Sequence, residues 1–459
     1  MKRLATILFL VAAFDVHALI TNNLAADWQG GIGITVSGGQ ISQWNDQHQL
    51  RNNDGLGPHA LTQSNAAYQP YDVTDAQDYR GVMFPWGFST ANPNTCLIIS
   101  NSLSGLNTTN LTVYIVATGP VEQDKNQTMI WFNGYGSGWV KFNLTGTYPA
   151  NYPASLFVGS QASTIYPPIN RAVFVGAGDA SKTTMRWNNV SQTNAPLSAI
   201  TTGSGGMVSS YNSNEFYSGV IYRILVYRVA HTTAQMDAQV AELAALYGVL
   251  TNYTKQVVCR GDSITAGIGS SMLQSYPFQL CERYPEIEWH NQGVSGLYIG
   301  TNGDSGGTMY DIDTNFVDTL YDGKLQQNWL FFFGGVNDIG SGLSGAVTFG
   351  RLTNYVAARH AVRPWTIIVS TVQAVANDSA RNSRNADYNS CIRTNIGNWD
   401  GMVDPGLNSL IETRLNNPYD TNYFYTDGLH LVNAGYQVLA QHFGQKINVP
   451  HRTTGFFGP

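Results

Sequence analysis

Ser263, His430 and Asp427 are the residues of this chain whose types and spacing could hydrolyse an ester. Ser263 follows the apolar run 257–259, so it stands where a buried strand gives way to a helix. His430 comes three residues after Asp427. A serine attacks a carbonyl when a histidine accepts its proton, and a carboxylate can orient that histidine and stabilise its charged form.

The same chemistry needs hydrogen-bond donors for the negative oxygen that forms on the attacked carbonyl. We expect three: the backbone N–H of Ser263, the backbone N–H of Gly296 and the side-chain amide of Asn337. A glycine at position 296 lets a substrate approach the backbone without meeting a Cβ. Each of these residues, and His430 and Asp427 as well, also has an ordinary explanation as a turn, cap or loop residue.

The elements that must position these residues alternate between strand and helix from residue 256 to residue 449. This alternation is typical of a parallel sheet with helices on both faces, in which ligands bind beyond the carboxyl ends of the strands. Ser263, the segment 291–296 and the segment 334–338 each follow a predicted strand, so they should meet at one edge with the loop 427–430. The predicted strands are 256–260, 286–291, 329–333, 366–372 and 401–403, and the predicted helices are 272–283, 314–320, 352–362, 380–399 and 433–446.

Residues 256–449 resemble the SGNH (GDSL) hydrolase family. The resemblance rests on Gly261-Asp262-Ser263-Ile264-Thr265, Gly296, Gly335-Val336-Asn337-Asp338 and Asp427-Gly428-Leu429-His430, with Ile264 where the family name has leucine. It implies a three-layer α/β fold of flavodoxin type with a parallel five-stranded sheet. It also implies a serine esterase mechanism with Ser263, His430 and Asp427 as catalytic residues, and neither a metal nor a cofactor.

Residues 21–248 are predicted to form an all-β jelly-roll sandwich, because short runs rich in Val, Ile and aromatic residues are separated by turn residues. One helix should end this part, since Thr232 and Gln235 fit a capping box and Gly248 is a natural stop. The predicted strands are 40–44, 96–100, 111–118, 129–132, 139–144, 172–176, 184–187 and 216–228.

This first half resembles the concanavalin A-like (laminin G-like) jelly rolls of exported bacterial enzymes, in the segments 39–47 and 216–248. The resemblance implies a glycan-binding domain. Trp131, Tyr135, Trp139 and Trp187 could stack on sugar rings, although aromatic residues in a sandwich more often belong to its core.

Composition and the chain ends limit the possible partners. Charged residues make up 12% of the 459, the formal net charge is −6, and no block of Lys and Arg occurs, which argues against a nucleic-acid partner. Residues 1–18 have a basic start, an apolar run and a small-residue cleavage site, so we expect a signal peptide and a secreted, extracellular or periplasmic protein. No other run is long enough to span a membrane. Residues 249–255 are the expected linker and 450–459 a tail.

Two further sequence features could mislead a functional assignment. Residues 303–307 fit the G-x-S-x-G string of a nucleophile elbow around Ser305, but their polar flanks predict a loop rather than a strand and a helix. Four cysteines occur without a Cys/His cluster, so no zinc site is expected, and their pairing is left open.

The sequence therefore predicts an exported serine esterase that removes short acyl groups, acetyl above all, from a carbohydrate. Its substrate would be an acylated polysaccharide or a small ester, and the polar loops 300–308, 340–345 and 377–385 favour sugar hydroxyls over a long acyl chain. The alternatives are a GDSL lipase, lysophospholipase or aryl esterase, and a glycan-binding surface protein with an inactive hydrolase domain. The oligomeric state is left open.

Overall fold

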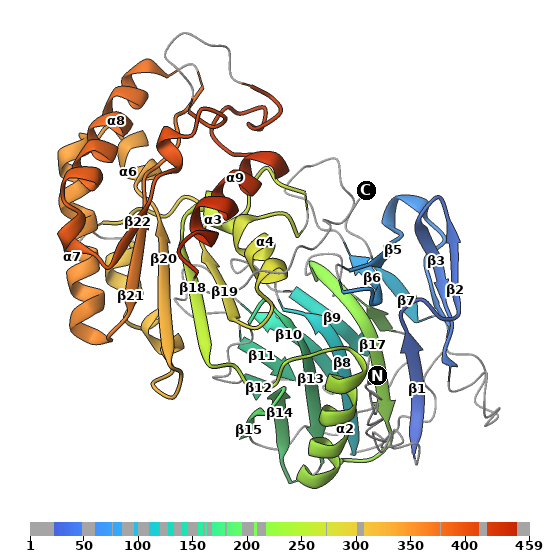
Figure 1. Cartoon of the computed structure of the whole chain (residues 1–459). Coiled ribbons are helices and arrows are strands. Elements are labelled where there is room, and N and C mark those ends of the chain that lie inside the picture. The colour runs from blue at the N-terminus through green and yellow to red at the C-terminus, as the bar shows by residue number, and fades with distance from the viewer. Residues whose placement is uncertain are drawn as a thin grey trace, which may run out of the picture.

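The computed structural model contains an antiparallel β domain followed by an α/β domain with a parallel sheet (Figure 1). The predicted signal peptide and the predicted tail lie outside the described residues. The structure describes residues 23–47, 60–75, 77–84, 96–99, 110–119, 127–132, 140–145, 155–158, 161–162, 168–179, 181–194, 206–208, 217–271, 273–300, 307–376, 378–412 and 420–447.

Antiparallel strands build the first domain in two groups, which the pairing of Gln40 with Tyr71 joins among the described strands. The first group is centred on β8 (Leu111–Thr118) and β17 (Gly219–Tyr227), which pair with each other. The all-β prediction is thereby confirmed. The remaining strands of the first group are β1 (Leu24–Gln29), β5 (Tyr71–Thr74), β6 (Arg80–Phe84), β13 (Arg171–Gly178), β14 (Thr183–Trp187) and β15 (Val190–Asn194). The second group consists of β2 (Ile34–Ser37), β3 (Gln40–Trp44), β4 (Leu61–Thr62), β7 (Leu97–Ile99), β9 (Gln127–Phe132), β10 (Val140–Thr145), β11 (Ser155–Val158), β12 (Gln161–Ala162) and β16 (Gly206–Val208).

Both faces of β8 are buried, which explains its nearly continuous apolar sequence. Ile115 packs into a core shared with the second strand group, whereas Tyr114 packs on the other face, which α2 (Thr233–Leu246) covers. The predicted capping box is present, since Thr232 accepts a hydrogen bond from the Gln235 N–H and the Gln235 side chain accepts one from the Thr232 N–H.

A buried ion pair explains why sequence patterns missed β1. Its residues read Leu-Ala-Ala-Asp-Trp-Gln, which lacks the β-branched residues typical of strands. Asp27 is nevertheless buried in this strand, because Arg223 of β17 donates two hydrogen bonds to its carboxylate at 2.9 and 2.7 Å. A partner almost two hundred residues away along the chain thus decides the conformation of β1.

Five parallel strands form the sheet of the second domain, in the order β19-β18-β20-β21-β22. Their residue alternation places Phe331 and Phe332 of β20 on opposite faces. The predicted parallel five-stranded sheet is confirmed, and the bounds of the last strand agree with the prediction. The strands are β18 (Lys255–Gly261), β19 (Glu288–Gly293), β20 (Gln327–Phe333), β21 (Thr366–Ser370) and β22 (Gly401–Val403).

Helices cover both faces of this sheet (Figure 1). On one face Phe331 stacks on Phe443 of α9 (Asn433–Gly444), which stacks in turn on Tyr276 of α4 (Tyr276–Arg283). On the other face Phe332 packs on Tyr355 of α7 (Gly345–Val362), and α7 packs on α8 (Ser379–Thr394). Cys281 of α4 and Cys391 of α8 therefore lie on opposite faces, and all four cysteines are free thiols.

The predicted helix 314–320 differs most from the structure. A short helix, α5 (Met309–Ile312), comes earlier, and only a 3-10 turn forms at Asp318–Leu320. Buried carboxylates account for the difference. Asp313 accepts hydrogen bonds from Arg260 and Tyr355, and Asp318 accepts them from Trp365 and Arg359. Further 3-10 turns lie at Ala66–Tyr68, Ile396–Asn398 and Pro405–Leu407.

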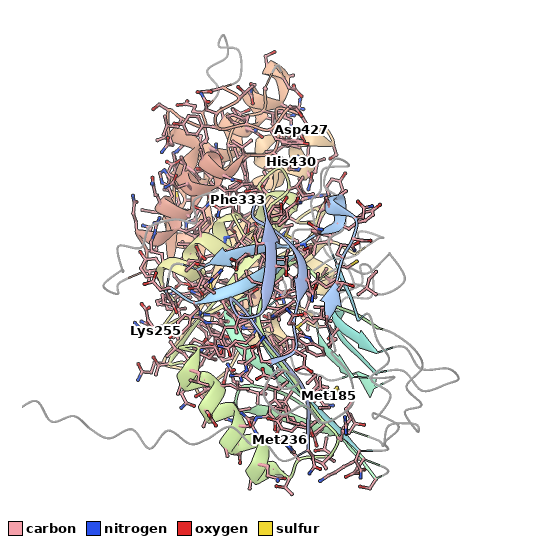
Figure 2. All side chains as sticks on the ribbon, turned by 90° about the vertical axis from the view of Figure 1, so that its right-hand side faces the viewer. Met185, Met236, Lys255, Phe333, Asp427 and His430 are labelled. Carbon is pink, nitrogen blue, oxygen red and sulfur yellow. The ribbon has the colours of Figure 1, made fainter. Side chains whose placement is uncertain are left out.

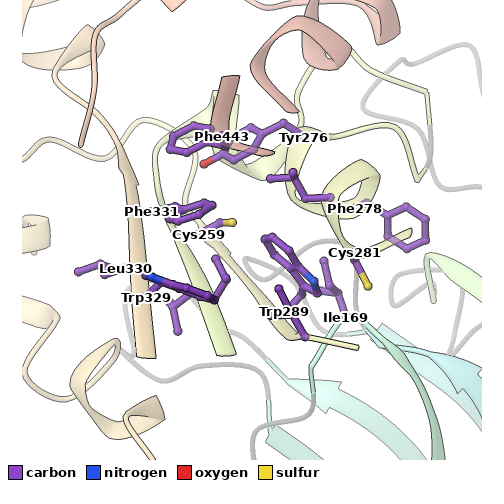
Figure 3. Close-up of a cluster of buried hydrophobic side chains, with 14 of the residues drawn as sticks. Ile169, Cys259, Tyr276, Phe278, Cys281, Trp289, Trp329, Leu330, Phe331 and Phe443 are labelled. Atoms are coloured by element: carbon purple, nitrogen blue, oxygen red, sulfur yellow. The ribbon is translucent and has the colours of Figure 1, made fainter. Parts of the chain in front are cut away.

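The two domains are joined at the outer edge of the parallel sheet. The Ile169 N–H donates to the Trp289 carbonyl of edge strand β19 at 2.8 Å. The Asn170 side chain accepts from the Trp289 N–H and donates to the Ile287 carbonyl, both at 2.8 Å. Figure 3 shows Ile169 beside Trp289 within the buried cluster. One hydrophobic core therefore continues from the β domain into the α/β domain.

Candidate active site

Ser263 is the first residue of α3 (Ser263–Ala266), directly after β18. The Asp262 carboxylate caps this helix by accepting the Ile264 N–H at 3.0 Å. Gly261 allows the tight junction, since a Cβ there would lie 2.1 Å from Thr265 Oγ1 and 2.2 Å from the Phe333 carbonyl oxygen. The strand-to-helix position that the sequence predicts for Ser263 is therefore present.

Ser263, His430 and Asp427 lie in one hydrogen-bonded row. His430 Nε2 is 2.8 Å from Ser263 Oγ, and His430 Nδ1 is 2.5 Å from Asp427 Oδ2. Asp427 Oδ1 also accepts the backbone N–H groups of Leu429 and His430, which fixes the carboxylate on its own loop. Figure 2 shows Asp427 and His430 on the side of Phe333, the last residue of β20, and far from Lys255, the first residue of β18. The row thus stands at the carboxyl edge of the sheet.

The electrostatics of this row favour proton transfer from the serine. Partial burial opposes ionisation of Asp427, but hydrogen bonds from the His430 ring and from two backbone N–H groups outweigh it and lower the pKa of the carboxyl. An ionised carboxylate only accepts, so His430 Nδ1 carries a hydrogen and Nε2 is left to accept the Ser263 hydroxyl proton. The site is open, since the Asp427 side chain keeps 41% of its surface exposed.

The expected oxyanion donors lie on neighbouring segments. Asn337 belongs to α6 (Val336–Gly340) and donates one of its amide hydrogens to the Leu297 carbonyl at 3.0 Å. Gly296, next to Leu297, has a φ of +76° and no atom within 4 Å of the place where a Cβ would stand. The Val294 N–H donates to the Gly261 carbonyl at 3.0 Å, which ties this loop to the end of β18.

Asp338 is a positioning residue whose role sequence patterns did not reveal. Its buried carboxylate accepts the Ile299 N–H and an Arg351 N–H, both at 2.9 Å. Asn337 and Asp338 together clamp the 294–299 loop against α6. The sequence feature that could have indicated this role is that Asn337 and Asp338 are neighbours. Two adjacent polar residues at the end of a buried strand can each hold a different part of the rim.

Asp262 brings a second buried carboxyl close to the serine. Burial, together with the neighbouring Asp338 carboxylate, raises the pKa of Asp262 to about 7, although the Ile264 N–H and the nearby Arg381 act in the opposite direction. Arg381 also donates to the Val336 carbonyl of α6 at 2.8 Å. The helices that carry Ser263 and Asn337 are therefore coupled through one buried polar group of residues.

Gly269 holds the histidine loop in place. Its φ is +89°, and a Cβ there would lie 2.7 Å from the Leu431 carbonyl oxygen and 3.1 Å from His430 Cβ. Tyr436 of α9 donates to the neighbouring Ile268 carbonyl at 2.7 Å. The turn after α3 is thus packed directly against the loop that carries His430.

Two expectations about the surroundings of the site need correction. Polar side chains of the segment 377–385 were expected to face the substrate, but Asn382 bonds both the N–H and the carbonyl of Val375, and Arg384 donates to the Ile339 carbonyl. These side chains hold the backbone instead. Trp187, a candidate for sugar stacking, is only 6% exposed and belongs to the sandwich core. Ser305 lies outside the described residues, as do the side chains of Trp131, Tyr135 and Trp139.

The described residues hold no group of three or more His, Cys, Asp or Glu side chains that could bind a metal ion. Within the same part of the chain, no helix combines the length and apolarity that crossing a membrane requires.

Residues 259–438 match the family of GDSL-like lipases and acylhydrolases. The matched residues all lie within the α/β domain. Among solved structures, a GDSL lipolytic protein from Veillonella parvula is similar at 15% identity, covers 43% of this chain and 100% of its own, and has a TM-score of 0.35. A carbohydrate acetylesterase from Sinorhizobium meliloti and an aryl esterase from M. smegmatis share 13% and 12% identity. Each covers 42% of this chain and 97% of its own, with a TM-score of 0.33. No curated protein matches the chain.

Proposed function

We propose that this protein is an exported serine esterase whose GDSL domain removes short acyl groups, acetyl above all, from a carbohydrate. The observation that carries the proposal is the hydrogen-bonded row from Ser263 through His430 to Asp427, at 2.8 and 2.5 Å. Export rests on the signal-like residues 1–18. The glycan-binding role of the first domain rests on the resemblance of its segments 39–47 and 216–248 to concanavalin A-like jelly rolls.

The reaction runs in two steps. Ser263 Oγ attacks the ester carbonyl while His430 Nε2 takes its proton, and the imidazolium then donates that proton to the leaving alcohol. The N–H groups of Ser263 and Gly296 and the second amide hydrogen of Asn337 stabilise the negative oxygen. Water then attacks the acyl-serine by the same route, which releases the acid and restores the hydroxyl.

The rim of the site supports a sugar substrate with a short acyl group. Tyr298, two residues after Gly296, is 40% exposed and offers an aromatic face for a sugar ring. Ser341 and Ser344 are exposed on the loop after α6. A long acyl chain would need an apolar trench, because each buried CH₂ contributes about 0.8 kcal/mol, and these polar residues do not supply one.

A series of p-nitrophenyl esters tests the proposal. Wild-type kcat/KM should be highest for acetate and should fall towards octanoate, and the protein should release acetate from an acetylated polysaccharide. Ser263→Ala and His430→Ala should abolish both activities with the fold unchanged, whereas Ser305→Ala should leave them intact. A kcat/KM that rises steadily with acyl length would favour a lipase, and substantial activity in Ser263→Ala would refute the nucleophile.

A further inference from the structure

A groove of about 400 Å³ lies at the opposite end of the parallel sheet from Ser263. Part of its lining comes from the first residues of β18 and β19, where Gln256 pairs in register with Glu288. The rest comes from the hairpin of β14 and β15 and from the segment after α5. The groove is lined by Trp187, Val190, Ser191, Gln192, Gln256, Glu288, His290, Thr319, Leu320 and Asp322. A volume of this order is typical of sites for small molecules.

Two deeply buried lining residues each have one ring nitrogen without a hydrogen-bond partner in the described part of the chain. They are Trp187 Nε1 and His290 Nδ1, on side chains from different domains that are 6% and 2% exposed. Buried polar atoms are normally satisfied, because an unsatisfied one costs about 1–3 kcal/mol. Two residues that line one groove thus each carry an unsatisfied nitrogen, which points to a ligand that binds there.

Trp187 Nε1 and His290 Nδ1 need different kinds of hydrogen-bond partner, the first an acceptor and the second a donor. Trp187 Nε1–H can only donate. His290 Nε2 lies 2.8 Å from Glu288 Oε1, so in the neutral ring Nε2 carries the hydrogen and Nδ1 accepts. A hydroxyl group both accepts and donates, so hydroxyls match this pair better than a purely acidic or purely basic group does.

The other lining residues narrow the ligand class. Glu288 and Asp322 accept hydrogen bonds, while Ser191 and Thr319 can both donate and accept. Among the described lining residues there is no Lys or Arg, which disfavours an anionic ligand, and polar residues outnumber the apolar Val190 and Leu320, which disfavours a lipid. Ser191, Thr319 and Asp322 are exposed, so the groove is open to a chain that extends beyond it.

We propose that this groove between the domains binds a neutral oligosaccharide segment, as a second site remote from the catalytic serine. The inference deepens the proposed function and rests on it for the carbohydrate nature of the substrate. A polymer held at the groove would remain near the carboxyl edge of the same domain, which raises the local concentration of its esters at Ser263.

Isothermal titration of the full chain with neutral xylan, cellulose and mannan oligomers tests the groove directly. At least one of them should bind. Ser191→Trp should fill the groove and weaken that binding by about tenfold or more, a change of about 1.4 kcal/mol or more. Thr193→Trp is the matched control, because Thr193 is an exposed residue of the same strand that does not line the groove. It should bind as the wild type does.

Hydrolysis of p-nitrophenyl acetate separates the two proposals. Both tryptophan variants should keep wild-type turnover of this small ester, since the groove is remote from Ser263. The groove proposal is overturned if no neutral oligomer binds, if Ser191→Trp binds like Thr193→Trp, or if chitosan or galacturonate oligomers bind more tightly than every neutral one. A wild-type protein that binds oligomers but hydrolyses no ester would instead refute the esterase and leave the groove in place.

Discussion

At the residue scale, identical carboxyl groups behave differently because their surroundings differ. Asp427 is partly exposed and accepts three hydrogen bonds, which lower its pKa. Asp262 is fully buried, and its pKa rises to about 7. The first is suited to hold and stabilise a charged imidazole, whereas the second caps α3 and loses its negative charge as the pH falls below about 7.

Asp427→Asn tests this assignment through both activity and pH. The variant should lose on the order of 10⁴ in kcat, because an amide can donate to His430 and impose the wrong tautomer. A lowered folded-state pKa means that the Asp427 contribution to stability is present above the ordinary value of 3.8 and is lost as the pH falls through the folded value. Thermal unfolding should therefore show that the melting temperature falls less between pH 7 and pH 3 in the variant than in the wild type. An unchanged kcat would rule out a catalytic role for Asp427.

Asn337→Ala tests the oxyanion donors. Loss of one of about three donors should lower kcat by roughly 10²–10³ with little change in KM, because the interaction strengthens only in the transition state. Steady-state kinetics on p-nitrophenyl acetate give both constants. A variant that loses affinity but keeps kcat would show that Asn337 binds the ground-state substrate instead.

At the element scale, short turns rather than long helices position the chemistry. The α3 turn, the 294–299 loop and α6 are held to one another by backbone carbonyls and by Asp338, and the turn after α3 presses against the histidine loop. None of these elements is long enough to be stable alone. Their geometry depends on glycines that no other residue can replace without a collision or strain.

Gly269→Ala should displace the histidine loop. The new Cβ would meet the Leu431 carbonyl and His430 Cβ, and we expect kcat to fall at least tenfold while the fold persists. Gly342→Ala is the matched control, since its φ of +99° imposes a similar backbone strain but no atom lies within 4 Å of its Cβ. Both variants should unfold at a lower temperature, and only Gly269→Ala should lose turnover. Equal turnover in the two would contradict the packing argument.

At the scale of the whole molecule, the β domain completes the edge of the hydrolase sheet. Asn170 satisfies the Trp289 N–H and the Ile287 carbonyl of the edge strand, and Ile169 packs into the same core. The expected linker is also anchored, since Val249 is buried and the Leu250 carbonyl accepts from Asn188. An uncovered edge strand exposes unpaired backbone groups and invites aggregation.

A hydrolase domain that starts at Lys255 should therefore be unstable or aggregate, with equal losses of activity on soluble esters and on polymer. Within the full chain, Asn170→Ala should lower the free energy of unfolding by about 1–3 kcal/mol, because it leaves two buried backbone groups unpaired. Asn189→Ala is the control, since its contacts with Thr251 and Asn252 also bridge to the linker but are exposed. Chemical denaturation measures both. A truncated domain with wild-type stability and turnover would refute this role.

Local patterns were enough to predict the α/β order, the parallel sheet, the capping box at Thr232 and the strand-to-helix position of Ser263. These features depend on the period of apolar residues and on short-range hydrogen bonds, which neighbouring residues determine. The hydrogen-bonded row of Ser263, His430 and Asp427 was also foreseeable, because parallel strands bring their carboxyl ends to one edge.

Other features were decided only by the tertiary structure. In these, a partner from a distant part of the chain overrides the local preference for a helix or a strand. Arg223 makes a strand of Leu24–Gln29, and buried Asp313 and Asp318 replace a predicted helix with turns. Asn170 links the two predicted domains by its hydrogen bond to Trp289, and the groove between the domains is lined by both Trp187 and His290. The physical reason is the same in each case: the free energy of a buried polar group depends on a partner that sequence spacing does not reveal.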